Sequence, residues 1–308
     1  MILNPYANRW KAASLQHEAE QALQQAGIGC TTVLTERPGH GIALAERAVR
    51  EGFTTIIAAG GDGSINEVVN GIARACLEDA HPWPALGLMP LGSANDLVAN
   101  LGLPADLAAA ARTIAQAKTR LMDLCTVSFA LSPGEAYSPP RYFVNNSAIG
   151  LEPTITLIQQ EISWLHGSPR YLLATVMGIL RNHQWNLRLA WDDGEYEGPS
   201  TLVTVGNNPR TGGLFYMTPH ADPFDGKLTF VYGQMETRRK ILALLPRTMK
   251  PGAGSYVEHP AIHEVHASWL RISVNKKTPI HTDGEIQAEG VQEVVYHVVP
   301  QILPTIVP

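Results

Sequence analysis

The feature that most constrains this chain is a glycine-rich octet, Gly60–Glu67, which reads Gly-Gly-Asp-Gly-Ser-Ile-Asn-Glu. The apolar run before it, Thr55–Ala59, has the length and branching of a buried parallel strand. After the octet, apolar residues recur at helical spacing from Ile65 to Cys76. The octet therefore marks a corner at which a strand passes into a helix.

Such a corner can bind an anion, because the first N–H groups of a helix have no partner within the helix and glycines let a phosphate approach the main chain. Asp62 would repel a bare phosphate. Its presence favours a Mg²⁺ ion that bridges to phosphate, or a proton taken from an attacking hydroxyl. A tight turn with a solvated aspartate explains the octet equally well when it is taken alone.

The octet does not match the two common nucleotide fingerprints, because G-x-G-x-x-G and G-x-x-x-x-G-K-[ST] are both absent from it. A dinucleotide-binding dehydrogenase and a Walker-type site are therefore not supported. The chain has 308 residues, 45% of them hydrophobic, which predicts about two domains. Its formal net charge of −5 argues against a protein that binds nucleic acid.

The three cysteines are odd in number, widely spaced and set in apolar surroundings, which is typical of thiols in a reducing compartment. No secretory signal precedes the first strand, so we expect a cytoplasmic protein. No apolar stretch reaches about 18 residues, the length that a spanning helix needs. Peripheral contact with a membrane and assembly into a homodimer both stay open.

Residues 1–125 alternate between short apolar strands and amphipathic helices, which predicts an α/β domain with an open, mostly parallel sheet. The expected strands are Met1–Leu3, Thr31–Leu34, Thr55–Ala59 and Leu86–Met89, and the expected helices are Ser14–Ala26, Gly41–Glu51, Ile65–Glu78 and Leu107–Ala117. In such sheets ligands bind beyond the carboxyl ends of the strands. Polar, turn-forming residues follow each of these strands, so four loops are expected to meet at one edge.

Residues 126–308 change to alternating strands with few helices, which predicts an antiparallel β domain, a sandwich or a flattened barrel. Whether the last segment packs back on the first domain stays open. The expected strands are Cys125–Phe129, Tyr142–Asn145, Trp185–Trp191, Leu202–Val205, Leu228–Tyr232, Leu270–Val274 and Val294–Val298. Two helices are expected among them, at Arg170–Arg181 and Thr237–Leu245.

Three further segments carry polar groups suited to chemistry. Pro90–Leu97 forms a second strand-to-helix corner with a hydroxyl, an amide and a carboxylate, although a helix cap accounts for it in isolation. Ala221–Leu228 places two aspartates three residues apart, which suits Mg²⁺ or Ca²⁺ or an ordinary turn. Thr282–Glu285 places two carboxylates around a glycine, where a hairpin tip is the simpler reading.

Taken in order along the chain, these segments resemble the diacylglycerol kinase catalytic-domain superfamily, which includes bacterial lipid kinases and the sphingosine and ceramide kinases. Gly60–Gly71 is similar to the central signature of that family, and Pro90–Leu97 to its P-x-G-T-x-N-D-[FL] segment. The other matching blocks are Asn4-Pro5, Phe143–Gly150, Pro219–Leu228 and Asp283–Glu285. The resemblance spans nearly the whole chain.

The resemblance implies an ATP- and Mg²⁺-dependent transfer of the γ-phosphate to a lipid hydroxyl, diacylglycerol or a related lipid, at a membrane surface. It implies an α/β nucleotide domain, a β-sandwich domain and a site in the cleft between them. It assigns nucleotide binding to Asn4, Thr35, Gly60, Gly61, Asp62, Gly63, Ser64, Asn66, Glu67, Ser93 and Asn95.

The same resemblance implies that Asp62 and Asp96 organise the catalytic Mg²⁺ and its waters. Glu285, with Asp283 beside it, is the favoured base for the acceptor hydroxyl, and Asp62 is the alternative. A second Mg²⁺ would order the active-site face, and it would be held by Asp222, Asp225 and the Lys227 carbonyl. Two other functions stay open, an NAD kinase and a nucleotide-binding regulator without turnover.

Overall fold

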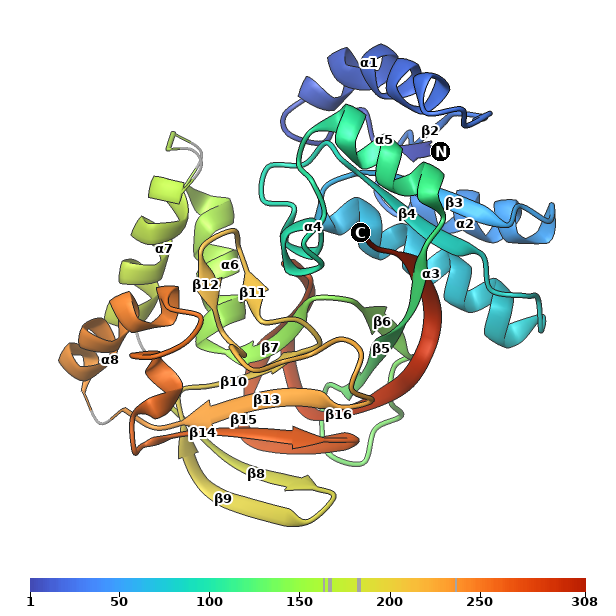
Figure 1. The fold of residues 1–308 in the computed structure, drawn as a ribbon. Helices are drawn as coiled ribbons and strands as arrows, with labels where there is room; N and C mark the ends of the chain where they lie inside the picture. Colours follow the sequence, from blue (N-terminus) through green and yellow to red (C-terminus); the bar gives the residue numbers. More distant parts are fainter. Residues whose placement is uncertain (163, 166–167, 182–183, 236) are drawn as a thin grey trace. The chain divides into compact units, whose positions relative to one another are not determined.

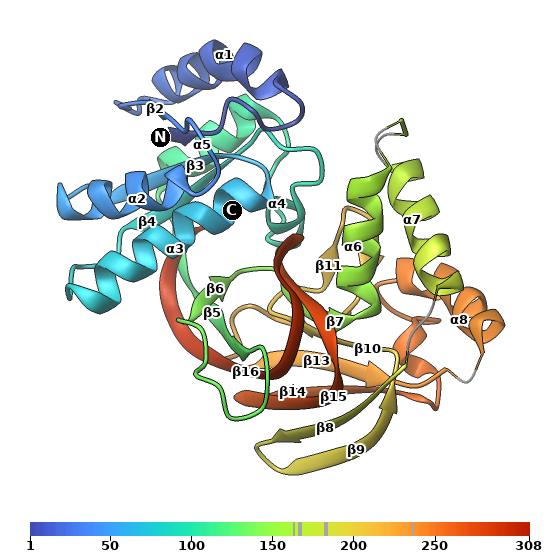
Figure 2. The same cartoon turned by 180° about the vertical axis from the view of Figure 1, so that it is seen from behind.

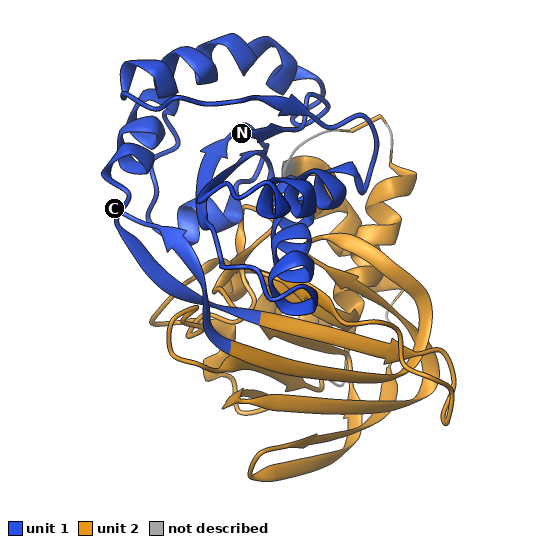
Figure 3. Ribbon diagram, turned by 90° about the vertical axis from the view of Figure 1, so that its right-hand side faces the viewer, with its two compact units in different colours: residues 1–124, 300–308 blue, residues 125–299 orange. Residues whose placement is uncertain are grey.

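The structure is a computed structural model, and it describes residues 1–162, 164–165, 168–181, 184–235 and 237–308. The chain forms two compact units, which Figure 3 shows in different colours. Unit 1 comprises residues 1–124 and 300–308, and unit 2 comprises residues 125–299. The chain passes from one unit to the other within two strands, β5 (Thr119–Ala130) and β16 (Glu285–Ile306).

Unit 1 is built on a parallel sheet in the order β4-β3-β1-β2, joined at its β4 edge by the end of β16. The strands are β1 (Ile2–Leu3), β2 (Val33–Leu34), β3 (Thr55–Gly60) and β4 (Ala85–Pro90). Residues 56–60 of β3 are buried on both faces, as the unbroken apolar run of that strand predicts. The parallel pairing brings the carboxyl ends of all four strands to one edge.

Helices cover both faces of this sheet (Figures 1 and 2). Unit 1 contains α1 (Lys11–Gln25), α2 (His40–Arg50), α3 (Asp62–Glu78), α4 (Asp96–Asn100) and α5 (Leu107–Gln116). α1 and α5 pack together over one face, where Leu23 and Ile114 share a core cluster with Ile57 of β3. α2 and α3 pack against each other and against β1 and β3, where Gly71 lets the two helices approach, since a Cβ there would lie 2.2 Å from the Ile42 carbonyl oxygen.

Unit 2 is built on antiparallel strands in the order β14-β13-β10-β7-β15-β16, with β8 and β9 continuing from β15 and β6 pairing with β5. Its remaining strands are β6 (Arg141–Phe143), β7 (Asn146–Gly150), β8 (Trp185–Trp191), β9 (Gly194–Ser200), β10 (Leu202–Gly206), β13 (Leu228–Gly233), β14 (Ile262–Ala267) and β15 (Trp269–Thr282). A separate small sheet pairs β11 (Arg210–Thr211) with β12 (Phe215–Tyr216).

The main core of unit 2 lies between its strands, where Phe143, Phe230 and Tyr296 are fully or almost fully buried. A second, smaller cluster lies among α6 (Leu151–Glu161), α7 (Ser168–Leu180) and α8 (Arg238–Leu244). Two 3₁₀ helices, η1 (Leu245–Met249) and η2 (Tyr256–Glu258), follow α8.

The expected fold class is confirmed, an α/β unit with a mostly parallel sheet and an antiparallel β domain. Several elements of unit 2 were not expected from the sequence, namely α6, β7, β9, β11, β12, β14 and the two 3₁₀ helices. Among the described residues, no helix is both long enough and apolar enough to span a membrane.

Candidate active site

Two strand-to-helix corners touch at the carboxyl edge of the unit 1 sheet. Gly61 belongs to the corner between β3 and α3, and Gly92 belongs to the one after β4. A Cβ at Gly92 would lie 2.3 Å from the Cα of Gly61, and a Cβ at Gly61 would lie 3.1 Å from the Cα of Gly92. A side chain is excluded at Gly92 and would be crowded at Gly61, and with glycine at both positions the main chain is bare where the corners meet.

Asp62 ties the two corners together by charge-assisted hydrogen bonds. Its Oδ2 accepts from the Asp96 N–H and its Oδ1 from the Leu97 N–H, both at 3.0 Å. These amides are the first two of α4, so the carboxylate caps a helix in another loop. Asp96 itself is buried, with 5% of its surface exposed.

The start of α3 is supported by the polar residues expected there. The Asn4 side-chain amide donates to Ser64 Oγ at 2.9 Å, and the Asn4 Oδ1 accepts from the Tyr6 N–H. Gly60 makes room for this contact, because a Cβ there would lie 2.5 Å from Ser64 Oγ. Asn66 is buried and accepts a hydrogen bond from Asn70 one turn later.

The loop after β4 is held by the side-chain amide of its own Asn95 and by a hydrogen bond to the loop after β1. Asn95 sits in the left-handed region at φ 50°, and its side chain exchanges hydrogen bonds with the main chain of Gly92. Ser93 Oγ donates to Asn8 Oδ1 at 3.0 Å. Ser93 and Asn95 therefore both lie in the loop that carries Gly92.

Glu67 of α3 holds the start of α2. Its two carboxylate oxygens accept the N–H groups of Gly39, at 2.7 Å, and Gly41, at 2.8 Å. Thr35 begins the loop before α2; it is 7% exposed, and its N–H donates to the Leu3 carbonyl. α3 thus supplies one carboxylate to the start of α4 and another to the start of α2.

At the start of α3, the N-cap residue Gly61 has no side chain that could cover the first N–H groups of the helix. The carboxyl edge of the unit 1 sheet therefore suits a phosphate group. It combines a surface without Cβ atoms, the main-chain N–H groups of a 17-residue helix and neighbouring hydroxyls.

In unit 2, Asp283 is part of a tight hairpin between β15 and β16. Asp283 and Gly284 have φ values of 45° and 81°, which is typical of a two-residue hairpin turn. The Asp283 carboxylate accepts three main-chain N–H groups, from Val144, Asn145 and Asn146, at 2.9 to 3.1 Å. This carboxylate therefore anchors the hairpin to the loop before β7.

Glu285 follows the turn and differs from Asp283 in its surroundings. Its side chain is 46% exposed and pairs with Arg141 at 3.3 Å. An exposed carboxylate on a firmly anchored turn can accept a proton from a substrate hydroxyl, which the buried Asp283, with three amide donors, is less suited to do.

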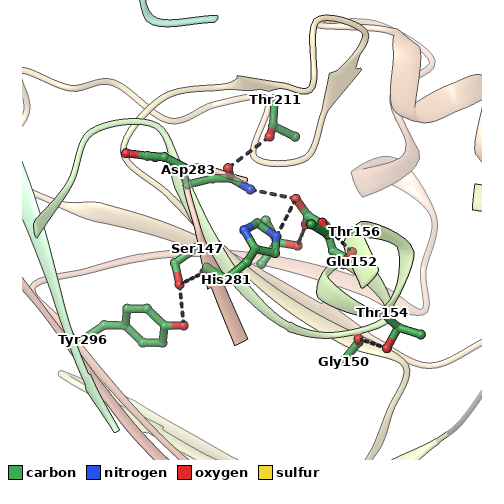
Figure 4. Close-up of polar contacts among 11 residues, drawn as sticks. Ser147, Gly150, Glu152, Thr154, Thr156, Thr211, His281, Asp283 and Tyr296 are labelled. Carbon is green, nitrogen blue, oxygen red and sulfur yellow. Dashed lines mark hydrogen bonds and ion pairs between the residues drawn. The ribbon is translucent and has the colours of Figure 1, made fainter. Parts of the chain in front are cut away.

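A buried polar network continues from this hairpin, and its central residue Glu152 was not singled out from the sequence (Figure 4). The Glu152 carboxylate accepts from Asn146 Nδ2 and Thr204 Oγ1, each at 2.7 Å, and lies 3.4 Å from His281 Nε2. Burial by itself raises the pKa of Glu152, but His281, Thr204 and Asn146 together lower that pKa below its ordinary value. The only sequence signal was a lone carboxylate within an apolar run.

The predicted second metal site lies in the turn before β13. Asp222 and Asp225 are exposed, and one oxygen of each caps the turn, accepting from the N–H of Phe224 and Lys227. These hard oxygens are of the type that Mg²⁺ prefers, but the turn offers only two carboxylates. No group of three or more metal-ligating side chains is found in the part of the chain that the structure describes.

Unit 2 also contains an apolar pocket with about 770 Å³ of empty volume, part of it open to solvent. It lies among α6, α7, α8, η1, β10 and β13. Ile155, Ile179, Val231 and Ile241 contribute apolar surface, and Glu152 is one of the few charged residues at its wall. A concave site lined mainly by apolar side chains with few polar groups is typical of small-molecule sites.

Comparison with known proteins identifies the family. The model of the "Diacylglycerol kinase catalytic domain" matches residues 1–127, and that of the "YegS C-terminal NAD kinase beta sandwich-like domain" matches residues 146–307. A protein of Chromohalobacter salexigens named "Probable lipid kinase YegS-like" is 30% identical over 87% of this chain and 81% of its own. The chain belongs to the diacylglycerol kinase catalytic-domain family. It is therefore a phosphotransferase of the kind that acts on an alcohol group.

A further relative agrees with the assignment to the diacylglycerol kinase family, and a solved structure shares the fold. A protein named diacylglycerol kinase from Staphylococcus haemolyticus is 27% identical over 85% of this chain and 74% of its own. The crystal structure of a diacylglycerol kinase from Bacillus anthracis strain Sterne shares the fold, with a TM-score of 0.76, 21% identity and coverage of 100% of this chain and 96% of that one. The resemblance drawn from the six sequence blocks is confirmed.

For this family member, the sequence-predicted residues fall into three groups. Asn4, Thr35, residues 60–67, Ser93, Asn95 and Asp96 lie at the carboxyl edge of the unit 1 sheet. Asp283 and Glu285 lie at the β15–β16 hairpin of unit 2, and Asp222, Asp225 and Lys227 lie in the turn before β13.

Proposed function

We propose that this protein transfers the γ-phosphate of ATP, with Mg²⁺, to the hydroxyl of a neutral lipid, diacylglycerol or a related lipid. The observation that carries the proposal is the contact between Gly61 and Gly92, where two loops meet without Cβ atoms at the start of α3. Phosphoryl transfer depends chiefly on positioning and on neutralising charge, and an edge of this kind serves both.

Nucleotide binding is assigned to the unit 1 edge. The N–H groups at the start of α3 would hold phosphate oxygens, and Ser64 and Ser93 would offer hydroxyls beside them. Asp62 and Asp96 would hold Mg²⁺ and its waters, and the ion would neutralise the charge on the transferring phosphate. Both Asp62 oxygens already accept an N–H, so the shape of the metal site depends on the contact between the corners.

Glu285 is proposed as the base for the acceptor hydroxyl. Its exposure makes its carboxylate accessible, whereas both oxygens of Asp62 accept main-chain N–H groups. Asp283 would act by fixing the hairpin from which Glu285 projects. Arg141 beside Glu285 would orient that carboxylate.

The acceptor is proposed to be a lipid because unit 2 provides an apolar pocket for a hydrocarbon chain. The pocket is lined mainly by aliphatic and aromatic side chains from three helices and the neighbouring strands. Burying a hydrocarbon chain there would release about 0.8 kcal/mol per CH₂ group. A second Mg²⁺ at Asp222, Asp225 and the Lys227 carbonyl would stabilise the turn before β13.

The test is incubation of the protein with Mg²⁺, ATP labelled in its γ-phosphate and a panel of neutral lipids in detergent micelles. We expect label in the organic extract with at least one lipid, and a loss of more than about a hundredfold in Asp62→Ala and Glu285→Ala. Exposed Glu78→Ala on α3 is the control. The proposal fails if no lipid is labelled or if both active-site variants keep full activity.

Two further arms separate the alternatives. NAD as the only acceptor tests for an NAD kinase, which would form NADP. Direct measurement of ATP binding tests for a regulator, which would bind the nucleotide and transfer its phosphate to none of the acceptors.

A further inference from the structure

Residues 35–41, called the 35–41 loop, join β2 to α2 and include the first two residues of that helix. They follow β2 at the carboxyl edge of the sheet to which nucleotide binding is assigned. The Thr35 N–H donates to the Leu3 carbonyl, and the Tyr6 hydroxyl donates to the Glu36 carbonyl. The Glu36 N–H donates to His40 Nδ1. The other strong contacts of this loop are the two hydrogen bonds to Glu67, at 2.7 and 2.8 Å. Charge-assisted bonds of this kind are about twice as strong as neutral ones.

The fit of Glu67 into this loop is close. A Cβ on Gly41 would lie 2.7 Å from Glu67 Oε2, so that position admits only glycine while the carboxylate is in place. Gly39 adopts φ 79°, a left-handed conformation that directs its N–H to the same carboxylate. The contact joins residues 26 and 28 positions apart in the chain.

The chemistry of Glu67 argues against a direct contact with ATP. A carboxylate repels phosphate, and both oxygens of this one already accept main-chain N–H groups. By accepting the N–H groups of Gly39 and Gly41, the carboxylate also removes them as a competing anion site at the start of α2.

We propose that Glu67 is a positioning residue for the nucleotide: through Gly39 and Gly41 it fixes the 35–41 loop beside the start of α3, in the shape that ATP requires. This inference rests on the proposed function, because it concerns the same nucleotide site. Glu67 touches neither the phosphates nor the acceptor, and it acts only through the loop.

The test compares Glu67→Gln with Glu78→Gln, an exposed carboxylate on the same helix, and Gly41→Ala with Gly29→Ala, which has open space around its Cβ. Gly41→Ala displaces the carboxylate without removing it, and it keeps the test decisive if Glu67→Gln folds poorly. Affinity for a non-hydrolysable ATP analogue is measured by calorimetry, and exchange of the Gly39 and Gly41 amide hydrogens by mass spectrometry or NMR.

In Glu67→Gln and Gly41→Ala, we expect both amides to exchange at least about tenfold faster and the affinity for the analogue to fall about tenfold. KM for ATP should rise by a similar factor, while kcat at saturating ATP should change less than twofold. A loss of folded protein would instead lower kcat and leave KM unchanged. The two control variants behave as the wild type does.

Unchanged amide exchange, or unchanged ATP affinity in both Glu67→Gln and Gly41→Ala, would overturn the role of Glu67 while an active wild type upheld the kinase proposal. The converse is also distinct. A wild type that binds the ATP analogue but phosphorylates no lipid contradicts the kinase proposal alone, because the comparison of nucleotide affinities still decides the role of Glu67.

Discussion

At the scale of the residue, the carboxylates of this protein differ by what surrounds them and not by their type. Asp62, Glu67 and Asp283 each accept two or three main-chain N–H groups, so they fix one segment of chain to another. Glu285 is half-exposed and pairs with one arginine, which suits a chemical role better. The sequence identified these residues, but it could not distinguish anchors from reactants, because the N–H partners lie far along the chain.

The anchoring role of Asp283 can be tested by Asp283→Asn. The neutral amide offers only one acceptor atom for three N–H donors, so the free energy of unfolding should fall by about 2 kcal/mol. Urea unfolding of the full chain measures the change. Asp193→Asn, at the exposed tip of the β8–β9 hairpin, is the matched control and should change stability by less than about 0.5 kcal/mol. Equal effects of the two substitutions would refute the anchor.

The buried Glu152 predicts a dependence of stability on pH. Burial raises the pKa of this carboxyl group, but the hydrogen bonds and charge around it lower the pKa below its ordinary 4.5. Because the folded pKa is the lower one, the stabilisation is present above the ordinary value and is lost as pH falls through the folded value.

Glu152→Gln removes this contribution. We therefore expect the difference in unfolding free energy between the wild type and the variant to be largest near neutral pH and to shrink below about pH 4. Denaturant titrations at a series of pH values measure it. A difference that stays constant from neutral to acid pH would show that the charge of Glu152 contributes nothing.

At the scale of the element, the segments predicted best are those in which apolar residues follow a clear alternating or helical pattern. Trp185–Trp191 was predicted with its bounds correct, because apolar and polar residues alternate over its first five residues. β9 was missed because it is polar and contains Gly198 and Pro199, features of an edge strand. α6 was missed because Gly150 and Pro153 flank its start, although proline is tolerated in the first turn of a helix.

The contact between the two corners predicts a steric effect of Gly92→Ala. The added Cβ would meet the Cα of Gly61 at 2.3 Å, and main-chain atoms cannot rotate aside. We expect a loss of about 1 to 3 kcal/mol in stability and of at least tenfold in affinity for an ATP analogue. Gly29→Ala serves as the control because its Cβ meets nothing. Normal nucleotide affinity in Gly92→Ala would contradict the proposal that ATP binds where the two corners meet.

The pocket among α6, α7 and α8 predicts the effect of a larger side chain at its wall. Ile241→Trp on α8 would fill part of the space, so KM for a long-chain lipid should rise about tenfold while the affinity for ATP stays unchanged. Leu180→Trp, which is exposed on α7 and does not line the pocket, is the control. Kinetic measurements with lipids of different chain length give both parameters, and a KM that Ile241→Trp leaves unchanged would exclude this pocket as the chain site.

At the scale of the whole molecule, the two units carry different chemistry. Unit 1 provides the edge suited to phosphate, and unit 2 provides an exposed carboxylate on an anchored hairpin and an apolar pocket. The order of the blocks along the chain was enough to predict the family and the fold class. The buried network around Glu152 could not be predicted, because it depends on strand pairing that places His281 of β15 beside Ala148 of β7.

The most direct test of the central claim is to incubate the wild-type protein with ATP, Mg²⁺ and a total lipid extract and to identify the products by mass spectrometry. The account predicts that a neutral lipid with a free hydroxyl gains one phosphate, that chelation of Mg²⁺ abolishes this product, and that Glu285→Ala fails to form it. If no lipid gains phosphate, while the same protein phosphorylates NAD or only hydrolyses ATP, the proposed lipid kinase activity is wrong.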